Sequence, residues 1–121
     1  MATATYKVLA QTGSSGNTGN GAATLTATTN TNLYTVPAST QTIVSSISIC
    51  NQASAAATYR IAVRPAGASI AAQHYVVYGA TVPASDSVIM TVGLTLGATD
   101  IITVYASAST LSFTVFGSEI A

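Results

Sequence analysis

Charged residues are scarce in this chain. Only 5% of its 121 residues are charged, and three acidic side chains balance three basic ones; an average soluble domain has about 25%. A neutral surface exerts no long-range attraction on nucleic acid or anionic lipid, so we expect neither as a partner. Because near-zero net charge favours association between proteins, the composition indicates a permanently assembled subunit, an outward-facing protein of an extracellular particle, or both.

Residues on which several kinds of site depend are also scarce. One cysteine, Cys50, excludes an internal disulfide and a cysteine-based zinc site, and one histidine, His74, excludes a histidine-based metal site within one chain. No apolar run approaches the roughly 18 residues of a membrane helix. The first ten residues lack the basic and apolar regions of a signal peptide. We therefore expect no cofactor, no metal and no membrane association, and folding in a reducing cytoplasm.

The acidic residues are too few and too dispersed to indicate catalysis. General acid–base chemistry needs two titratable groups that converge on a substrate. Asp86 and Asp100 lie in turn-like sequence, where turn formation explains an aspartate, and Glu119 is close to the C-terminus. A Gly-x-Ser-x-Gly nucleophile elbow is absent from the sequence. We therefore expect a protein that is not an enzyme.

The segment from Gln41 to Pro65 carries the clearest structural signal. Its first half alternates Ile43, Ile47 and Ile49 with small or polar residues, and its second half alternates apolar and polar residues between positions 58 and 64. Such alternation gives each strand one apolar face. The Asn51–Ala57 segment between them predicts a hairpin loop, and residues 107–110 predict another further along the chain.

The whole chain predicts an all-β protein with one domain. No segment has helical periodicity, and about eight short strands are spaced by roughly 8–12 residues. The motif Thr35–Ser39 (TVPAS) recurs as Thr81–Ser85, and each copy precedes a strand, which favours equivalent positions in two sheets. We expect a single-domain β-sandwich, jelly-roll-like, over residues 22–121. The predicted core is Ile43, Ile47, Ile49, Tyr59, Ile61, Val63, Val77, Val88, Met90, Val92, Leu94, Ile102, Val104, Phe113 and Val115.

The N-terminal segment differs from the rest in composition. Residues 12–21 (TGSSGNTGNG) contain four glycines and no large side chain, as in a linker. We therefore expect residues 1–21 to form a flexible or extended arm outside the core. Tyr6, Val8 and Leu9 are its predicted anchors on a neighbouring subunit or surface.

Several further side chains are candidates for an interface. Arg60 and Arg64 share one face of a predicted strand, where they either cover apolar surface with their stems or pair with a carboxylate of another chain. Strand 73–78 has bulk on both faces, with Tyr75 on one and His74 and Tyr78 on the other.

Glu119 and four tyrosines are the remaining candidates, and the sequence leaves the role of each open. Glu119 is either solvated or paired across an interface. The tyrosines Tyr59, Tyr75, Tyr78 and Tyr105 are candidates for a sugar-stacking platform, although such platforms usually include tryptophan, which this chain lacks.

Seven strings occur in an order that resembles a known group of proteins. They are Leu33–Pro37 (LYTVP), Ile49–Asn51 (ICN), Tyr59–Gly67 (YRIAVRPAG), His74–Tyr75 (HY), Leu94–Asp100 (LTLGATD), Val104–Tyr105 (VY) and Phe116–Ile120 (FGSEI). The pattern resembles small virion structural proteins of tailed bacteriophages, particularly those that infect cyanobacteria. It covers nearly all of residues 31–120, and Tyr6–Leu9 (YKVL) matches the usual start.

The resemblance implies a non-enzymatic virion component made in the host cytoplasm. Small all-β proteins of this group often serve as capsid cement or decoration proteins, which sit as homotrimers on the outer shell and contact the major capsid protein. Others belong to the neck, tail, baseplate or fibres. A host-surface carbohydrate-binding module is a third, distinct expectation, and copy number in the virion separates a cement protein from a tail component.

Overall fold

The described part of the chain folds into nine strands and two single turns of 3₁₀ helix. The computed structural model describes residues 3–121, apart from the side chain of Val92. The two 3₁₀ turns have three residues each, and neither is a candidate for crossing a membrane. The elements are β1 (Ala4–Gly13), β2 (Gly16–Gly19), β3 (Thr31–Thr35), β4 (Gln41–Asn51), β5 (Ala57–Arg64), η1 (Pro65–Gly67), η2 (Ala72–His74), β6 (Tyr75–Val82), β7 (Ser87–Leu96), β8 (Ile101–Ala106) and β9 (Leu111–Ile120).

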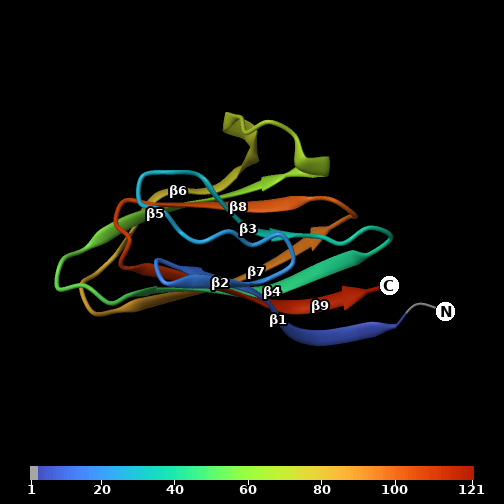
Figure 1. The fold of residues 1–121 in the computed structure, drawn as a ribbon, viewed down its shortest axis with the longest axis horizontal. Helices are drawn as coiled ribbons and strands as arrows, with labels where there is room; N and C mark the ends of the chain where they lie inside the picture. The colour runs from blue at the N-terminus through green and yellow to red at the C-terminus, as the bar shows by residue number, and fades with distance from the viewer. Residues whose placement is uncertain (1–2) are drawn as a thin grey trace.

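The strands form two antiparallel sheets that pack face to face. One sheet has the order β2-β1-β9-β4-β7 and the other the order β3-β8-β5-β6. Figure 1 shows the four-stranded sheet above the five-stranded one, with η1 and η2 projecting over the former and both termini at one end. The prediction of an all-β sandwich is therefore confirmed. The jelly-roll arrangement stays a prediction, with which this strand order is compatible.

Two expected hairpins are instead connections between the sheets. β4 lies in the five-stranded sheet and β5 in the four-stranded one, so the Asn51–Ala57 loop crosses between layers, and the loop from β8 to β9 does the same. The buried side chain of Asn51 holds this corner together. Its Nδ2 donates to the carbonyl oxygens of Ala55 and Val82 at 2.9 and 3.2 Å, and its Oδ1 accepts from the backbone N–H of Ala53 at 3.0 Å. Sequence composition shows a turn, but not which layer the chain enters next.

The core fills the space between the two sheets. Eight predicted core residues are buried: Ile47, Ile49, Tyr59, Ile61, Ile102, Val104, Phe113 and Val115. Val63, Val77, Val88, Met90 and Leu94 are partly buried against the same cluster. The sequence prediction missed a second group of buried residues: Leu9, Leu25, Leu33, Tyr34, Val36, Val44, Val82, Leu96 and Leu111.

Ile43 is a wrong core prediction, and Val92 lies outside the described side chains. Ile43 is 45% exposed, whereas its neighbour Val44 is fully buried. The cause is a β-bulge, because the register shifts between Val44 and Ser46 against both β9 and β7. One extra residue reverses the facing of every residue that precedes it in the strand. Ser45, at the bulge, donates its hydroxyl hydrogen to the carbonyl oxygen of Phe116 at 3.1 Å.

The N-terminal segment is part of the sandwich, which corrects the prediction of an arm over residues 1–21. β1 pairs with β9 from Ala4 to Thr12, and β2 folds back on β1 as a short hairpin. Leu9 and Ala10 lie in the core with at most 3% exposure. The sandwich therefore includes β1 and β2 as well as the predicted range 22–121. The Gly- and Asn-rich composition of residues 12–21 reflects a hairpin turn and a loop against β3 rather than a free linker.

Candidate functional site

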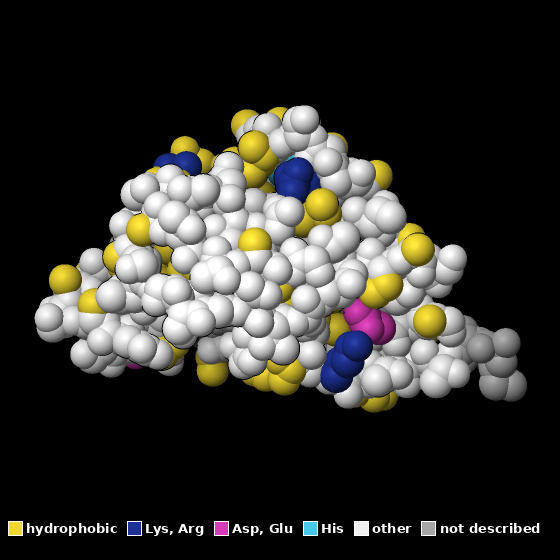
Figure 2. All heavy atoms as spheres, in the orientation of Figure 1, with side chains coloured by type: hydrophobic (Ala, Val, Ile, Leu, Met, Phe, Trp, Pro, Cys, Tyr) yellow, Lys and Arg dark blue, Asp and Glu magenta, His cyan; other side chains and the backbone are white. Residues whose placement is uncertain are grey.

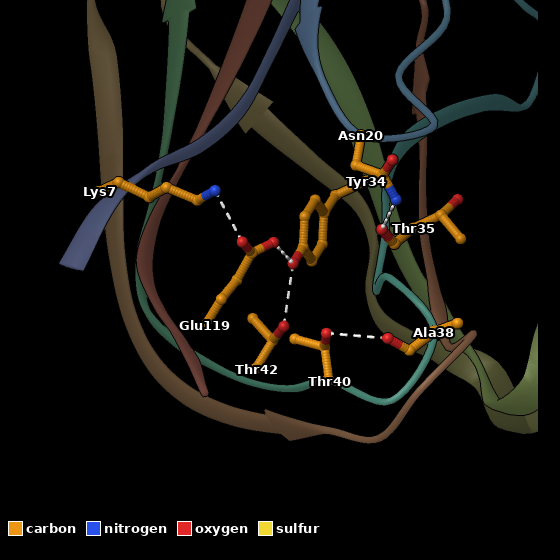
Figure 3. Close-up of polar contacts among 8 residues, drawn as sticks. All are labelled: Lys7, Asn20, Tyr34, Thr35, Ala38, Thr40, Thr42 and Glu119. Carbon is orange, nitrogen blue, oxygen red and sulfur yellow. Dashed lines mark hydrogen bonds and ion pairs between the residues drawn. The ribbon is translucent and has the colours of Figure 1, made fainter. Parts of the chain in front are cut away.

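A polar cluster lies at the end of the sandwich where β1, β3, β4 and β9 meet (Figure 3). Nζ of Lys7 contacts Oε1 of Glu119 at 2.6 Å. The hydroxyl of Tyr34 donates to the other carboxylate oxygen of Glu119 and lies 2.9 Å from the hydroxyl of Thr42. Tyr34 and Thr42 are fully buried. Glu119 is thus paired within its own chain. It is neither solvated nor paired across an interface, the two alternatives that the sequence left open.

The surroundings of Glu119 fix its charge state. Burial alone would raise the pKa of Glu119, but the hydrogen bonds from Lys7 and Tyr34 and the charge of Lys7 outweigh burial and hold this pKa below its usual value. Burial and the hydrogen bond to Glu119 raise the pKa of Tyr34, so its hydroxyl stays protonated and donates. The cluster closes one end of the core, and every polar atom named in it has a partner.

Glu119 makes the stability of the fold sensitive to acid. A carboxyl group with a lower pKa in the folded than in the unfolded chain stabilises the fold above its unfolded pKa, and this contribution disappears as pH falls through the folded pKa. We expect the urea midpoint of the wild type to fall between about pH 6 and about pH 3, and that of Glu119→Gln to fall less. The difference isolates Glu119 from Asp86 and Asp100. Parallel pH profiles for the two proteins would contradict the assignment.

A stack of three side chains stands on the outer face of the four-stranded sheet. Arg60 on β5 is opposite Tyr105 on β8 and opposite Tyr78 on β6. The guanidinium carbon lies 4.2 Å from the centre of the Tyr78 ring and 4.3 Å from that of the Tyr105 ring. Each such cation–π contact contributes about 0.5–1 kcal/mol at an exposed site. The rings therefore fix a side chain that would otherwise be mobile.

The irregularity at Val76 in β6 puts Tyr75 and Tyr78 on the same face. Val76 has no partner between the pairs Ile61–Val77 and Ala62–Tyr75, and Gly79, with φ of 77°, interrupts the pairing a second time. The expectation that Tyr75 and Tyr78 face opposite ways is therefore wrong. Their rings meet edge to face, with centres 4.9 Å apart. Together with Ile70, Ala71 and Ala72 they line a shallow groove of about 610 Å³.

The remaining candidates on this sheet are held by contacts within the chain. Arg64 donates from Nε to Thr103 at 2.9 Å, from Nη2 to Asn32 at 2.9 Å and from Nη1 to the carbonyl oxygen of Ala68 at 3.1 Å. Nδ1 of His74 accepts from the backbone N–H of Ala71 at 3.0 Å, which fixes the start of η2. Both residues position local structure, whereas Arg60 donates no hydrogen bond to any of the described residues.

The tyrosine platform for sugars loses support in this arrangement. Tyr78 and Tyr105 each turn a ring face toward Arg60, and Tyr59 is buried with an edge contact to Phe113. A stacking platform needs ring faces open to a ligand. Tyr75 and the outer face of Tyr78 are the parts of the predicted platform that border the groove.

The outer face of the five-stranded sheet carries an apolar strip. Residues on this face follow the register of the strands, since opposite residues share a face. Tyr6 and Val8 on β1 are 84% and 47% exposed, and Ile89 on β7 is 69% exposed. Among the described residues, this face bears no charged side chain. The strip is Tyr6, Val8, Ile43, Phe116 and Ile89, with Ser46, Ser48, Thr91 and Thr114 between them.

Figure 2 shows the molecule from the side, with hydrophobic side chains along the lower edge, below the five-stranded sheet, and along the upper edge. Most of the surface between these edges is backbone and uncharged polar side chains. A hollow of about 370 Å³ lies within the strip, between Tyr6, Ile43 and Phe116, and Lys7 also borders it. Exposed apolar side chains gathered on one face of a sheet are typical of a contact with another macromolecule.

Two predicted anchors belong to this strip and one does not. Tyr6 and Val8 are exposed on the strip, as an interface requires, but Leu9 is buried, so its assignment to an interface is wrong. The register of β1 shifts between Val8 and Ala10, and this shift turns Leu9 inward. Sequence reasoning missed Ile43, Ile89 and Phe116 as exposed residues of this face. Two sequence features indicate bulges: the apolar run Val8–Ala10 in β1 and Gly93 in β7, where the register shifts against β4.

The described residues contain no group of three or more histidine, cysteine, aspartate or glutamate side chains arranged to hold a metal ion. Comparisons of this chain with family models, with curated proteins and with solved structures find no match.

Proposed function

We propose that this chain is a structural protein of a bacteriophage virion, a cement or decoration protein that binds the outer surface of the capsid. The observation that carries the proposal is the uncharged apolar strip on the five-stranded sheet, with Tyr6 and Ile89 at its two ends. A flat, rigid sheet face with this composition suits a permanent contact with another protein surface. The resemblance of the sequence to phage virion proteins supplies the kind of partner, the major capsid protein.

The mechanism needs binding and no catalysis. Coat subunits meet at joints in a shell that is under outward pressure from packaged DNA. A small oligomer that spans a joint ties several subunits together, and its several contacts make the loss of any single one reversible. Because the strip is apolar and uncharged, its affinity comes from shape and burial and is insensitive to salt. The proposed oligomer is a homotrimer, the number that the resemblance implies.

Two other functions remain in competition. A neck, tail, baseplate or fibre protein would use the same strip on a different partner. A host-surface carbohydrate binder would use Tyr75 and the groove beside Tyr78, but the engagement of Tyr78 and Tyr105 with Arg60 favours the structural function.

Copy number tests the location. A cement protein is present in numbers comparable to the major capsid protein, whereas a neck or tail component is present in far fewer copies. Densitometry of purified virions, together with electron cryomicroscopy of the shell, measures both the number and the position. We expect density for this protein at regular sites on the capsid lattice. A bare lattice, with the protein confined to the tail, would overturn the cement assignment.

Substitutions in the strip test the binding surface. Tyr6→Ser combined with Ile89→Ser removes two exposed apolar side chains without opening the core, so the fold should be retained. We expect binding to particles that lack the protein to weaken at least about 10-fold, because two large exposed apolar side chains are lost from the proposed contact. The matched control is Val76→Ser, which removes a 48% exposed apolar side chain from the other sheet. Equal binding by the double variant and the wild type would contradict the use of this strip.

A further inference from the structure

The chain has three carboxylates, and two of them are fully engaged within it. Glu119 pairs with Lys7 and Tyr34. Both oxygens of Asp100 accept backbone N–H groups, each at 2.8 Å. Asp86 differs, because only its Oδ1 is engaged, by the backbone N–H of the next residue at 2.7 Å. The residue is exposed and its Oδ2 contacts no donor among the described residues.

Of the three cationic side chains, two are likewise held by hydrogen bonds within the chain and the third is not. Lys7 is paired with Glu119, and Arg64 donates three hydrogen bonds to uncharged groups. Arg60 is held only by the faces of Tyr78 and Tyr105. The N–H donors of Arg60 make no hydrogen bond to the described residues, so they are available to bind a carboxylate in a bidentate pair. Arg64 and Asp100 are held by uncharged groups, so Arg60 and Asp86 are the cation and the anion with the fewest hydrogen bonds within the described residues.

Asp86 is presented on an exposed turn of small residues. The turn belongs to the repeated TVPAS motif, in which Ser39 and Ser85 have the same left-handed backbone, with φ of 55° and 52°. In the first copy the next residue, Thr40, is buried and donates to the carbonyl oxygen of Ala38. The second copy has the exposed Asp86 at this position. The turn therefore does not require an aspartate after its last serine, because the first copy has a buried threonine there. Formation of the turn does not explain why the second copy exposes a carboxylate.

The charges of Arg60 and Asp86 do not meet within one chain. Lys7–Glu119 is the ion pair that the described residues form. Arg60 is opposite Tyr78 in the middle of β6, whereas Asp86 follows the end of β6, beyond Val82. Pairing of these charges therefore requires a second copy of the chain.

We propose that Arg60 of one subunit binds Asp86 of the next, with the β6–β7 turn of the second subunit seated against Tyr75 and Tyr78 of the first. Exposed Pro83 and Ala84 of that turn are small and apolar, and the groove beside the tyrosines is lined by Ile70, Ala71 and Ala72. Apolar contact and charge complementarity thus coincide at one place.

In the proposed trimer the contact is heterologous, because Arg60 of each subunit faces Asp86 of the next one; reciprocal pairing of the same two residues across a two-fold axis would give a dimer instead. Heterologous contacts close into rings when the rotation between subunits permits, and a three-membered ring is the smallest. The inference rests on the self-association included in the proposed function and names the surface that produces it. It leaves the apolar strip of the other sheet free for the capsid.

Charge reversal tests this contact in the purified full-length chain. Sedimentation velocity and equilibrium measure the association of the wild type, Arg60→Asp, Asp86→Arg and the double variant, with circular dichroism confirming that each is folded. Like charges forced together at an interface weaken it strongly, so each single variant should raise the dissociation constant at least about 10-fold. The double variant restores opposite charges and should recover part of that loss. Arg64→Gln is the control on the same strand and should leave association unchanged in the folded protein.

Each outcome decides the inference. A wild-type trimer that both single variants weaken and the double variant rescues supports it. A monomeric wild type, or an oligomer that all variants leave unchanged, overturns it. Unchanged association with lost particle binding by Arg60→Asp also overturns it, because Arg60 would then contact the capsid. None of these results bears on the copy number in virions, which is the measurement that tests the proposed function. The two proposals are therefore tested independently.

Discussion

Ile47→Ala should lower the free energy of unfolding by about 2–5 kcal/mol, whereas Ile43→Ala should cost less than about 1 kcal/mol. The two residues are four positions apart on β4 and are the same amino acid, and the sequence places them on one face. In the structure Ile47 is fully buried and Ile43 is 45% exposed. The bulge at Ser45 separates them, so only the loss of the Ile47 side chain leaves a cavity between the sheets.

Urea unfolding of the two variants measures this difference. Both remove the same atoms, so the difference in unfolding free energy reports burial and not residue type. Ile61→Ala, at a fully buried position of β5, is a second comparison in the range expected for Ile47→Ala. Equal costs at positions 43 and 47, or a larger cost at 43, would show that the bulge is absent and that the strand alternates regularly.

Strand alternation predicts the facing of residues only where a strand is regular. On β5, Tyr59 and Ile61 point inward and Arg60 and Arg64 outward, as the sequence predicts. The predictions fail on β4 and β6, where bulges change the facing within one strand. A bulge is a relation between two strands, so a pattern read along one strand does not contain it.

The prediction of an arm at the N-terminus fails for a different reason. Its glycines and asparagines are the residues of linkers and equally of tight hairpin turns, and composition does not separate the two. Thr12, in this stretch, is buried at 3% exposure, and its hydroxyl donates to the carbonyl oxygen of Ala23 at 2.6 Å. Pairing with β9, more than 100 residues later in the chain, decides the structure of the segment.

The candidate site depends on contacts between distant parts of the sequence. Arg60, Tyr78 and Tyr105 come from three strands and meet because of the register between β5, β6 and β8. The sequence identified Arg60 and Arg64 as equivalent candidates. The difference between them is set by their neighbours, two aromatic rings for Arg60 and three hydrogen-bond acceptors for Arg64.

Removal of residues 1–21 should abolish cooperative unfolding of the isolated protein. The truncation removes β1 and β2, takes Leu9 and Ala10 out of the core and leaves the largely buried carboxylate of Glu119 without Lys7. Loss of Leu9 alone costs about 2–5 kcal/mol, and a domain of this size has only about 5–15 kcal/mol of stability. The edge of β9 would also be unpaired and open to aggregation.

Circular dichroism and thermal unfolding of the truncated chain test this expectation. The control is removal of residues 1–3, which leaves β1 whole and, among the described residues, removes the backbone pair between Thr3 and Ala121. A finer comparison is Leu9→Ala with Val8→Ala, since the first residue is buried and the second is 47% exposed. If the chain without residues 1–21 unfolds as cooperatively as the full chain, the segment contributes nothing to the sandwich and is an arm. If it does not, any loss of particle binding on truncation reports a loss of fold, and the substitutions at Tyr6 and Ile89 are then the valid test of the binding surface.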